Sequence, residues 1–467
     1  MLSRRQAFLL ITDILTLVLA IGFSYWVRLP KLWSELGGLV GVFRTHTGAC
    51  SLLIGTNLLC LYIFDNYNDH RIWNSAKSFR TIVTSCLIAA VLCASFFYLS
   101  VHWSVGRGLA ALQFATCLVG FCLNRSALHL LAPYIETSQK TIIVGSRQAA
   151  LMLLQECSLH PACSVRPVAY LDSNANSTSN VAYGAAWIPG YGQNTSLGEL
   201  LEKYEAQMLV VAQDPHDSLD PKLLREILQY KVRGMRVSDM PTLYKKISGK
   251  VPIYNVSDMW FLLSGGFDIP SRPVLRNTLR LFDIATALIG LAITLPIWPV
   301  IALMIKLETG GPVLYRQKRV GLWGRPFEVL KFRTMPVDAE INGPQWASGP
   351  TDPRVTRVGR ILRRTRLDEI PQFIQILKGE MSLIGPRPER PEFVEKLKAR
   401  IPFYELRFAV RPGLTGWAQV NFGYGASVED AAVKLQYDLY YIQENSLLLN
   451  LRIIFRTIRT ILFARGS

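Results

Sequence analysis

Four apolar segments, each close to the length of a bilayer crossing, open this 467-residue chain. A helix needs roughly 20 mostly apolar residues to span the hydrocarbon core of a membrane. Half of all residues are hydrophobic, only 18% are charged, and the mean hydropathy is +0.22. The sequence therefore predicts a membrane protein in which residues 1–138 form a four-helix transmembrane bundle. The predicted spans are Ala7–Val27, Thr47–Phe64, Thr81–Val101 and Leu109–Leu131.

Basic residues indicate the orientation of these spans, because positive residues gather in cytoplasmic loops. They occur at the N-terminus, in the second loop and after the fourth span. We therefore expect the N-terminus and everything after the fourth span to be cytoplasmic. Arg125, inside the fourth segment, is expected to extend its guanidinium to the membrane interface. The basic residues that indicate the orientation are Arg4, Arg5, Arg71, Lys77, Arg80, Lys140 and Arg147.

Residues 139–263 alternate short apolar runs with helical stretches, as in a parallel sheet flanked by helices. The first turn keeps one glycine, Gly145, where a dinucleotide fingerprint has three. A degenerate Rossmann-like domain is therefore favoured over a working nucleotide site. Residues 264–276 are predicted to be a linker and residues 173–180 a flexible loop. The predicted strands are Thr141–Gly145, Val168–Asp172, Met208–Ala212 and Met235–Pro241, with a helix at Pro221–Lys231.

An almost wholly apolar stretch, Leu281–Leu307, follows the linker. Pro296 and Pro299 fall in its middle, where each proline removes a backbone hydrogen bond and bends a helix. Basic residues flank the stretch on both sides, which places both of its ends in the cytoplasm. A re-entrant helix that breaks at the prolines explains both observations, and a fifth full span is the alternative. Asp283, near the entry, is expected to pair with a nearby arginine such as Arg280.

The C-terminal part of the chain concentrates basic charge around two adjacent carboxylates, Asp368 and Glu369. From residue 272 onward there are 29 Lys and Arg against 17 Asp and Glu, with no His and no Cys. Without imidazole or thiolate, carboxylate is the best nucleophile or metal ligand left. Taken alone, such a pair is more typical of a solvated ion-pair helix. The basic excess suits a phosphate-bearing substrate and an anionic membrane surface, and we expect no nucleic-acid partner.

Five basic side chains are candidates for binding phosphate, and each also has a structural explanation. A strand with a solvated basic face is the alternative for Lys331 and Arg333. A rigid turn is the alternative for Arg387, which lies between two prolines, and a turn is equally plausible for Arg411. The candidates are Lys331, Arg333, Arg366, Arg387 and Arg411. Three tryptophans could stack on a base or a sugar, although packing is the commoner role. They are Trp323, Trp346 and Trp417.

Several motifs occur in the order typical of the bacterial sugar transferase family of monotopic phosphoglycosyl transferases, which the chain resembles. They are YRQKRVG (Tyr315–Gly321), KFRTM (Lys331–Met335), RRTRLDEIPQ (Arg363–Gln372), GPRPERP (Gly385–Pro391) and RPGLTG (Arg411–Gly416). Four spans and a degenerate nucleotide fold look like the large members, polyprenyl-phosphate hexose-1-phosphate transferases. The resemblance implies a monotopic α/β catalytic domain in residues 277–467 with a re-entrant membrane helix. One departure is Leu295, where the family commonly has a serine at the helix break.

The resemblance implies a two-step transfer of hexose-1-phosphate from a UDP-sugar to polyprenyl (undecaprenyl) phosphate, with release of UMP. Asp368 matches the family's nucleophile, which carries a covalent phosphosugar, and Glu369 matches its partner, expected to bind Mg²⁺. Glucose and galactose are both plausible sugars. The implied setting is the cytoplasmic face of the bacterial inner membrane, at the first membrane step of exopolysaccharide, capsule or O-antigen (lipopolysaccharide) synthesis. A homodimer is the expected assembly.

Two other classes of protein share parts of this pattern. A membrane-anchored nucleotide-sugar dehydratase or epimerase needs a glycine-rich turn and a Tyr-x-x-x-Lys pair, and the chain contains no Tyr-x-x-x-Lys. A non-enzymatic scaffold or assembly regulator has no need of the Asp368–Glu369 pair. The tail, Ser446–Gly466, carries arginines at helical spacing with apolar residues on the other face, which favours an interfacial helix over a core helix. These arginines are Arg452, Arg456 and Arg459.

Overall fold

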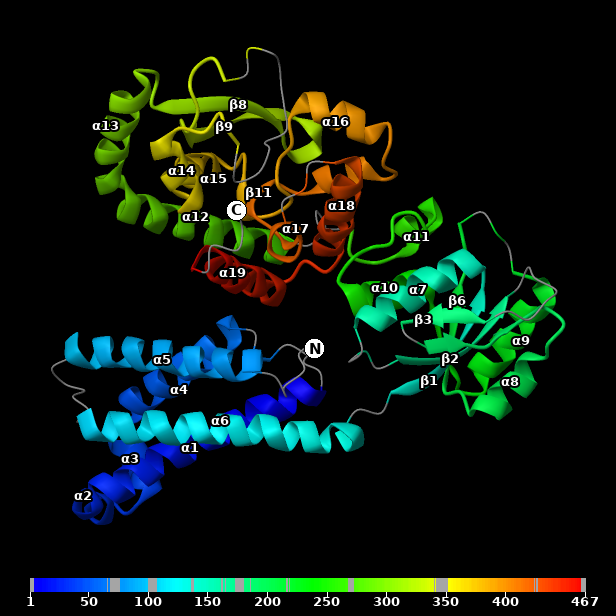
Figure 1. Cartoon of the computed structure of the whole chain (residues 1–467), viewed down its shortest axis with the longest axis horizontal. Helices are drawn as coiled ribbons and strands as arrows, with labels where there is room; N and C mark the ends of the chain where they lie inside the picture. The colour runs from blue at the N-terminus through cyan, green and yellow to red at the C-terminus, as the bar shows by residue number, and fades with distance from the viewer. Residues whose placement is uncertain are drawn as a thin grey trace. The chain divides into compact units, whose positions relative to one another are not determined.

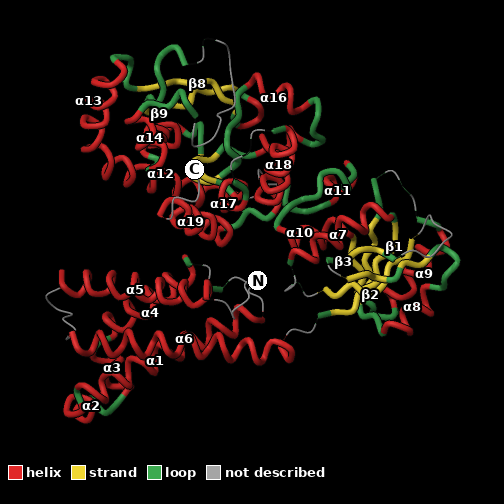
Figure 2. Tube along the Cα trace, viewed as in Figure 1, coloured by secondary structure: helices red, strands yellow, loops and turns green. Residues whose placement is uncertain are grey.

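The computed structural model describes residues 4–462 except 65, 68–75, 100–106, 136–137, 161–162, 164, 173–179, 185, 216, 218, 268–272, 340, 342–351, 424 and 426. Figures 1 and 2 show a chain built of helices and several small sheets. The chain divides into two compact units, the first containing Met1–Lys140 and His160–Arg166, the second Thr141–Leu159 and Pro167–Ser467. The combination of long apolar helices and sheets confirms a membrane protein of mixed structure.

Four long helices make up the first unit. They are α1 (Arg4–Arg28), α4 (Thr47–Ile63), α5 (Ala76–Leu99) and α6 (Arg107–Ile135), with the short α2 (Pro30–Glu35) and α3 (Leu39–Thr45) between α1 and α4. Buried side chains from all four long helices pack into one core. α1, α5 and α6 contain stretches long and apolar enough to cross a membrane. α4 passes the same test only together with α3, from which it is bent by 97°.

Arg125 on α6 is buried inside this bundle and forms an ion pair with Asp13 on α1. The Asp13 carboxylate also accepts hydrogen bonds from the Tyr67 hydroxyl at 2.8 Å and from the Asn124 amide at 3.0 Å. The prediction that Arg125 extends to the interface is therefore wrong. A charged side chain within a membrane helix can remain inside a bundle when another helix supplies its counter-ion, and Asp13 lies 112 residues away in the sequence.

A five-stranded sheet forms the first part of the second unit. Its strand order is β5-β2-β1-β6-β7, and the pairs β2–β5, β1–β6 and β6–β7 are parallel. The predicted strands and helix of this region are confirmed, with ends shifted by a few residues, whereas residues 173–179 of the predicted loop lie outside the described chain. β3 (Val181–Tyr183) and β4 (Ala186–Ile188) form a separate antiparallel hairpin. The sheet and its helices are β1 (Gln139–Gly145), α7 (Arg147–Leu159), β2 (Val165–Asp172), β5 (Gly190–Tyr191), α8 (Leu197–Tyr204), β6 (Met208–Ala212), α9 (Pro221–Val232), β7 (Arg236–Asp239) and α10 (Met240–Ser248).

The carboxyl edge of this sheet, where a dinucleotide fold would bind a pyrophosphate, holds a carboxylate. Asp214 follows β6 and accepts hydrogen bonds from the Ser146 hydroxyl at 2.6 Å and from the Asn255 amide at 2.8 Å. Gly145 has φ = 140°, and a Cβ there would lie 2.0 Å from the Ala212 carbonyl oxygen. The single glycine of this turn is therefore required by strand packing, and the negative charge of Asp214 disfavours a diphosphate beside it.

The rest of the second unit is built around two consecutive helices, called the hairpin below, and two small sheets; the stretch Pro273–Thr309 that contains these helices is also long and apolar enough to cross a membrane. α12 (Pro273–Thr294) and α13 (Trp298–Thr309) run in different directions on either side of a 3₁₀ turn, η2 (Leu295–Ile297), as Figure 1 shows. β8 (Leu314–Val320) and β9 (Pro326–Phe332) are antiparallel, and β10 (Ser382–Ile384) pairs in parallel with β11 (Gly413–Thr415). The other elements are η3 (Leu322–Gly324), α14 (Arg357–Arg364), η4 (Leu367–Gln372), α15 (Phe373–Lys378), α16 (Pro391–Lys398), η5 (Tyr404–Ala409), α17 (Trp417–Asn421), α18 (Val428–Gln443) and α19 (Leu447–Leu462).

The chain that joins the two parts of the second unit, residues 249–267, contributes to the core of the C-terminal part. Val251 is fully buried there, and α11 (Asp258–Leu263) adds two aromatic side chains. The Val251 amide donates to the Gln436 carbonyl on α18 at 3.0 Å. The start of the predicted linker is also held, because the Gln443 side chain donates to the Gly265 carbonyl at 3.0 Å. Residues 268–272 of that linker lie outside the described residues.

We expect the C-terminal part to be less stable to thermal unfolding when this segment, residues 249–267, is removed. A chain that begins at residue 271 loses Val251, Ile253, Trp260 and Phe261 from its core. Burying one large apolar side chain contributes about 1.5–3 kcal/mol. A chain that begins at Gly249 keeps all four. Thermal unfolding in the same detergent should give a lower midpoint for the shorter chain, and equal midpoints would show that the segment is not part of this core.

Candidate active site

Asp368 and Glu369 lie on the 3₁₀ turn η4, between α14 and α15. α14 ends at Arg364, and Arg366 then adopts a left-handed conformation, with φ = 59°, that turns the chain into η4. Both carboxylates are only 7% exposed. A solvated ion-pair helix, the alternative weighed for this pair, is therefore excluded. Two adjacent buried acids require neighbours that compensate for lost hydration.

Two basic side chains from separate elements converge on Glu369. Lys331 on β9 donates from Nζ at 2.9 Å, and Arg387, in the turn after β10, donates from Nη2 at 2.7 Å, both to Oε1 of Glu369. Burial alone would raise the pKa of Glu369, but Arg387 and Lys331 outweigh it and hold this pKa well below its usual range. Glu369 is therefore ionised. The structure thus brings two of the predicted phosphate-binding residues to the predicted metal-binding carboxylate.

Asp368 is compensated far less than its neighbour. Among the residues that the structure describes, no donor reaches its buried Oδ1 atom. Burial raises the pKa of Asp368, the charge of Glu369 raises it further, and Lys331, Arg363 and Arg366 oppose both effects without cancelling them. A carboxylate oxygen that accepts no hydrogen bond, beside basic side chains, is suited to attack a phosphoryl group or to bind a cation.

The helical hairpin packs against the turn that carries the two carboxylates. Ile301 on α13 shares a buried cluster with Ile370 of η4. Gly290 on α12 faces the ring of Phe373 so closely that a Cβ would lie 2.7 Å from it. A larger residue at position 290 would therefore displace the start of α15, which directly follows η4.

Both ends of the hairpin are fixed to the segment that contains the dyad. Near its start, Arg280 donates to two carbonyls in the last turn of α15, at 2.5 and 2.7 Å. Near its end, Glu308 accepts from two backbone amides at the start of α14, at 2.7 and 3.0 Å. Between these ends, Pro296 lies in η2 and Pro299 lies in the first turn of α13. Both helices of the hairpin therefore return to one short stretch of chain.

Asp283 does not form the predicted ion pair with Arg280. Its Oδ1 atom accepts hydrogen bonds from the Ser382 hydroxyl at 3.0 Å and from the Leu383 amide at 2.8 Å, both on β10. The Arg280 guanidinium is directed to α15 instead. The prediction relied on proximity within one helix and could not include a strand that packs against that helix.

Arg333 and Arg411, also predicted to bind phosphate, make other contacts. Arg333 donates from Nε to the Pro312 carbonyl at 2.7 Å, and its guanidinium lies over the Tyr315 ring. Burial lowers the pKa of Arg411, and the nearby Arg280 lowers it further. Within the described residues, no hydrogen bond joins either arginine to the dyad. Arg366, by contrast, acts on both carboxylates through its charge.

The tryptophans considered as stacking platforms have different surroundings. Trp417 is 5% exposed, stacks on Tyr440, and donates from its indole nitrogen to the Gly249 carbonyl at 2.9 Å. It is a packing residue that ties α17 to the joining segment. Trp323 is 60% exposed, and Trp346 lies outside the described residues.

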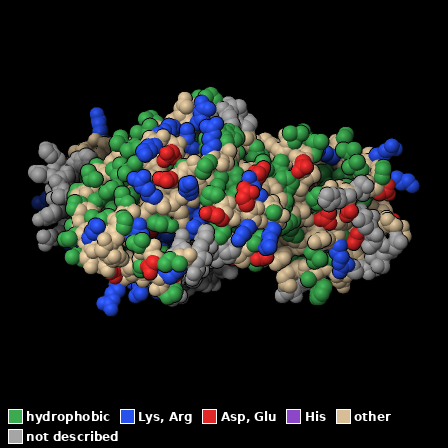
Figure 3. Space-filling model, turned by 90° about the horizontal axis from the view of Figure 1, so that it is seen from above, with side chains coloured by type: hydrophobic (Ala, Val, Ile, Leu, Met, Phe, Trp, Pro, Cys, Tyr) green, Lys and Arg blue, Asp and Glu red, His purple; other side chains and the backbone are tan. Residues whose placement is uncertain are grey.

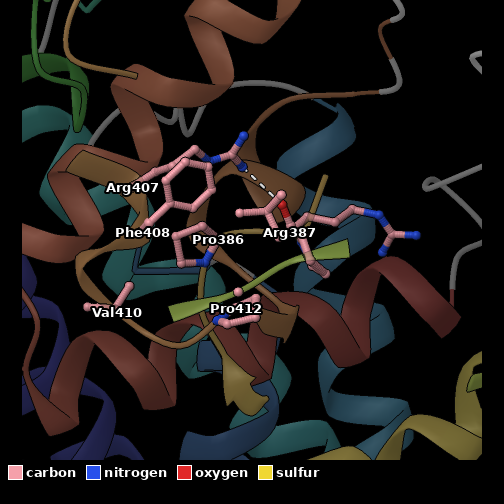
Figure 4. Close-up of a pocket in the computed structure, with 9 residues that line it drawn as sticks. Pro386, Arg387, Arg407, Phe408, Val410 and Pro412 are labelled. Carbon is pink, nitrogen blue, oxygen red and sulfur yellow. Dashed lines mark hydrogen bonds between the residues drawn. The ribbon is translucent and has the colours of Figure 1, made fainter. Parts of the chain in front are cut away.

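A small pocket, open to solvent, lies behind Arg387. Figure 4 shows Arg407 and Phe408 on one side of it, with Pro386, Val410 and Pro412 around the rest, while the Arg387 side chain points away. Arg407 donates from Nη2 to the Arg387 carbonyl at 3.0 Å, the dashed line of Figure 4. Arg407 was not predicted, because a lone arginine in an apolar stretch carries no motif.

Basic side chains also gather on the surface of the C-terminal part. Viewed from the side of β8, Lys and Arg side chains are grouped over this part of the molecule, with few acidic ones among them (Figure 3). Exposed members of β8 and of the loop after it are Arg316, Lys318 and Arg325. Such a face raises the local concentration of anionic molecules.

The dyad fits one mode of magnesium binding. The described residues contain no group of three or more His, Cys, Asp or Glu that could hold a metal ion. Mg²⁺ does not require such a group, because it keeps several waters and binds through one or two carboxylates plus substrate phosphates. The Oδ1 atom of Asp368 accepts no hydrogen bond from the described residues, whereas the Oε1 atom of Glu369 already contacts two cations. This donor set suits a magnesium ion shared with a diphosphate.

Fold and site together define a membrane protein with a buried carboxylate pair, Asp368 and Glu369, beside several basic side chains. Residues 275–464 match the family model described as bacterial sugar transferase. Over 186 residues the chain is 45% identical to a UDP-glucose:undecaprenyl-phosphate glucose-1-phosphate transferase of Caulobacter vibrioides, a match that covers 39% of this chain and 69% of that protein. The chain belongs to the bacterial sugar transferase family.

Two further relatives extend the comparison beyond that region. A UDP-glucose:undecaprenyl-phosphate glucose-1-phosphate transferase of Xanthomonas campestris pv. campestris is 29% identical over an alignment of 485 positions, which covers 93% of this chain and 96% of that protein. A UDP-N-acetylgalactosamine-undecaprenyl-phosphate N-acetylgalactosaminephosphotransferase of Aeromonas hydrophila is 43% identical over 229 residues. That match spans 46% of this chain and about half, 54%, of the Aeromonas protein.

Proposed function

We propose that this protein transfers a hexose-1-phosphate from a UDP-sugar to polyprenyl phosphate, specifically undecaprenyl phosphate, and releases UMP. The observation that carries the proposal is the double ion pair of Glu369 with Lys331 and Arg387, beside a buried Asp368. The names of three relatives state transfers of this kind. Glucose and galactose remain the proposed sugars, and N-acetylgalactosamine joins them because of the Aeromonas relative.

The reaction follows from the chemistry of a carboxylate nucleophile. An Oδ atom of Asp368 attacks the phosphorus next to the sugar, and the bond from that phosphorus to the bridging oxygen breaks. UMP leaves with the bridging oxygen and its electron pair, and the phosphosugar stays on Asp368 as an acyl phosphate. An oxygen of polyprenyl phosphate then attacks the same phosphorus, which forms the polyprenyl-diphospho-sugar and frees the carboxylate. This step places the protein at the start of exopolysaccharide, capsule or O-antigen synthesis.

The basic side chains of the site balance the charge of the diphosphate. Lys331 and Arg387 lie on the Glu369 side of the dyad, and Arg363 and Arg366 act on Asp368 through their charges. Positive groups fixed before the reaction stabilise charge on the transferred phosphoryl group without reorganisation. Asp368 and Glu369 would hold Mg²⁺, which when bound neutralises diphosphate oxygens.

The hairpin of α12 and α13 is proposed to enter the membrane and return to the cytoplasmic face. The apolar stretch is far longer than a crossing requires, only 11% of its most apolar window is buried, and both ends are bonded to α14 and α15. α19 adds a second apolar surface, with Leu447, Leu448, Leu451 and Ile458 exposed. Interfacial helices bind bilayers through such surfaces. The exposed apolar residues of the hairpin include Leu281, Leu288, Ile289, Ile293, Leu295, Val300, Leu303 and Leu307.

Cysteine labelling tests this topology. All eight native cysteines lie between residues 50 and 163 and are free thiols, so a cysteine-free background is practical. Single cysteines are introduced as Asn277→Cys and Thr309→Cys. Both should react with a membrane-impermeant maleimide in inside-out vesicles, and neither should react in intact cells. Labelling from opposite sides would replace the re-entrant hairpin with a full span.

The proposed activity is tested on the purified full-length protein with Mg²⁺, undecaprenyl phosphate and a panel of UDP-sugars. We expect UMP release with at least one sugar, and a lipid product whose mass equals undecaprenyl diphosphate plus that sugar. Omitting the lipid should stop turnover after one phosphosugar per site. UDP instead of UMP as the released nucleotide would contradict a phosphosugar transfer and indicate simple glycosyl transfer.

A further inference from the structure

Arg407 on η5 is a buried cation that does not contact the carboxylate dyad. It is 6% exposed. Its Nη1 atom donates to the Tyr404 hydroxyl at 2.5 Å, and its Nη2 atom donates to the Arg387 carbonyl at 3.0 Å. The same Nη2 atom lies 2.9 Å from Oδ2 of Asp438 on α18, which forms its counter-ion. Figure 4 shows the hydrogen bond from Arg407 to the Arg387 carbonyl, with the Arg387 side chain pointing away from Arg407.

Burial of the Arg407–Asp438 ion pair is energetically costly, because both charged groups lose their hydration. Asp438 is 2% exposed, and burial raises its pKa to about 6 although Arg407 opposes the shift. Well-packed apolar residues in place of a buried ion pair are often as stabilising or more so. A buried pair is best attested as a device that fixes one specific arrangement. The arrangement that Arg407 fixes is the backbone at Arg387.

The backbone around Arg387 is held from several directions. The Gly385 amide donates to Thr415, and the Gly413 amide donates to the Pro386 carbonyl, both at 2.9 Å. Arg319 donates from Nη1 to the Pro388 carbonyl at 2.9 Å. The flanking prolines lack an amide hydrogen and cannot donate backbone hydrogen bonds. Hydrogen bonds donated to the carbonyl groups therefore hold much of this turn. Arg407 supplies the donor to the central residue, whose side chain pairs with Glu369.

We propose that Arg407, with Asp438 as its counter-ion, is a positioning residue that sets the direction of the Arg387 guanidinium toward the dyad. Within the described residues Arg407 makes no hydrogen bond or ion pair to the dyad, and it acts through its hydrogen bond to the Arg387 carbonyl. The role in turnover rests on the proposed sugar-phosphate transfer. The effect of Arg407 on the conformation of the turn around Arg387 does not depend on that proposed function, and it can be measured without substrate.

A double-mutant cycle separates positioning from a general structural effect. Arg407→Met should lower kcat/KM for the UDP-sugar on the order of 10- to 100-fold, since small misplacements of a binding group cost that much. In an Arg387→Met background, Arg407→Met should cause no further loss, because the guanidinium that Arg407 positions is already gone although the backbone carbonyl remains. Lys245→Gln, which removes the ion pair with Glu444 at 2.7 Å, is the matched control and should leave kcat/KM unchanged. Independent losses that multiply in the double variant would overturn the proposal.

A second pair of variants controls for stability. Arg407→Met alone leaves Asp438 buried and unpaired, and should lower the unfolding midpoint. The Arg407→Met/Asp438→Leu double variant should recover that midpoint but not kcat/KM, because the donor to Arg387 is still missing. Recovery of both would show that the pair is merely structural. Arg407→Lys keeps the charge and a donor, and is expected to restore part of the activity.

Hydrogen exchange decides the placement independently of turnover. Peptides covering residues 384–393 should exchange faster in Arg407→Met/Asp438→Leu than in the wild type, while peptides from the five-stranded sheet stay unchanged. Equal exchange in residues 384–393 would overturn the positioning role even if the wild type is active. Failure of the wild type to release UMP would refute the proposed function, and the exchange result would still stand on its own.

Discussion

Replacing Asp368 with asparagine should abolish UMP release while leaving the protein at least as stable as the wild type. The amide has the shape of the carboxylate but cannot form the acyl phosphate, and loss of a nucleophile lowers kcat by at least about 10³-fold. Stability should not fall, because within the described structure Oδ1 of Asp368 accepts no hydrogen bond and burial disfavours its charge. Removal of a functional charge from such a site is commonly neutral or stabilising.

Two measurements on the same preparation make this prediction sharp. With UDP-sugar but no polyprenyl phosphate, the wild type should gain the mass of one phosphosugar and Asp368→Asn should gain nothing. Glu444→Gln, which disturbs an ion pair on the surface of α18, should behave as the wild type in both assays. An unchanged rate of UMP release in Asp368→Asn would show that Asp368 is not the nucleophile. A dead variant with a clearly lower unfolding midpoint would attribute the loss to folding instead.

Two substitutions on either side of Asp368 should move the pH dependence of the first half-reaction in opposite directions. The reactive form of Asp368 is ionised, so kcat/KM must rise with pH as this carboxyl loses its proton. Burial and then Glu369 raise its pKa, and Lys331 lowers it. Lys331→Met removes a cation, so the pKa rises and the acid limb moves to higher pH. Glu369→Gln removes an anion, so the pKa falls and the limb moves to lower pH.

The position of the acid limb is the diagnostic quantity, since both variants also lose activity. Glu369→Gln should lower the plateau on the order of 100-fold, because Lys331 and Arg387 lose their anchor and the site loses a ligand for Mg²⁺. The assay should omit polyprenyl phosphate, whose own phosphate titrates near neutral pH. Shifts of the same sign in the two variants would show that the limb does not report Asp368. Glu369→Gln activity that keeps the wild-type dependence on Mg²⁺ would remove this carboxylate from metal binding.

The features that could be predicted are those with a local physical signature. An apolar stretch of bilayer length identified α1, α5 and α6, and a short run such as Met208–Ala212 identified a buried strand to the residue. The dyad was singled out because carboxylate is the best nucleophile or metal ligand in a half of the chain that has no His and no Cys. Lys331 and Arg387 were found because a basic residue within a strand or between prolines has a restricted direction, and both meet Glu369.

The features that could not be predicted depend on contacts between distant parts of the chain. Asp13 and Arg125 meet only because α1 packs on α6, and neither helix alone reveals the pair. Arg407 reaches the site through the Arg387 carbonyl, a group that no sequence pattern distinguishes. Asp283 binds β10 instead of its helical neighbour Arg280. In each case the packing of whole helices and strands determines which side chain is the partner. The local periodicity of the sequence carries no information about that packing.

The hydrogen bonds from Arg280 to α15 and from α14 to Glu308 connect the carboxylate dyad to the helices that we propose enter the membrane. The stretch that carries Asp368 is held at both ends by the same apolar hairpin, and the Ile370 side chain beneath it is covered by that hairpin. Under the proposed topology, membrane insertion of the hairpin and assembly of the dyad are one folding event. A soluble version cannot be obtained by trimming the hairpin, because the cut would expose the underside of the catalytic turn. Detergents that fail to support the bend at η2 should inactivate the protein before they unfold its five-stranded sheet.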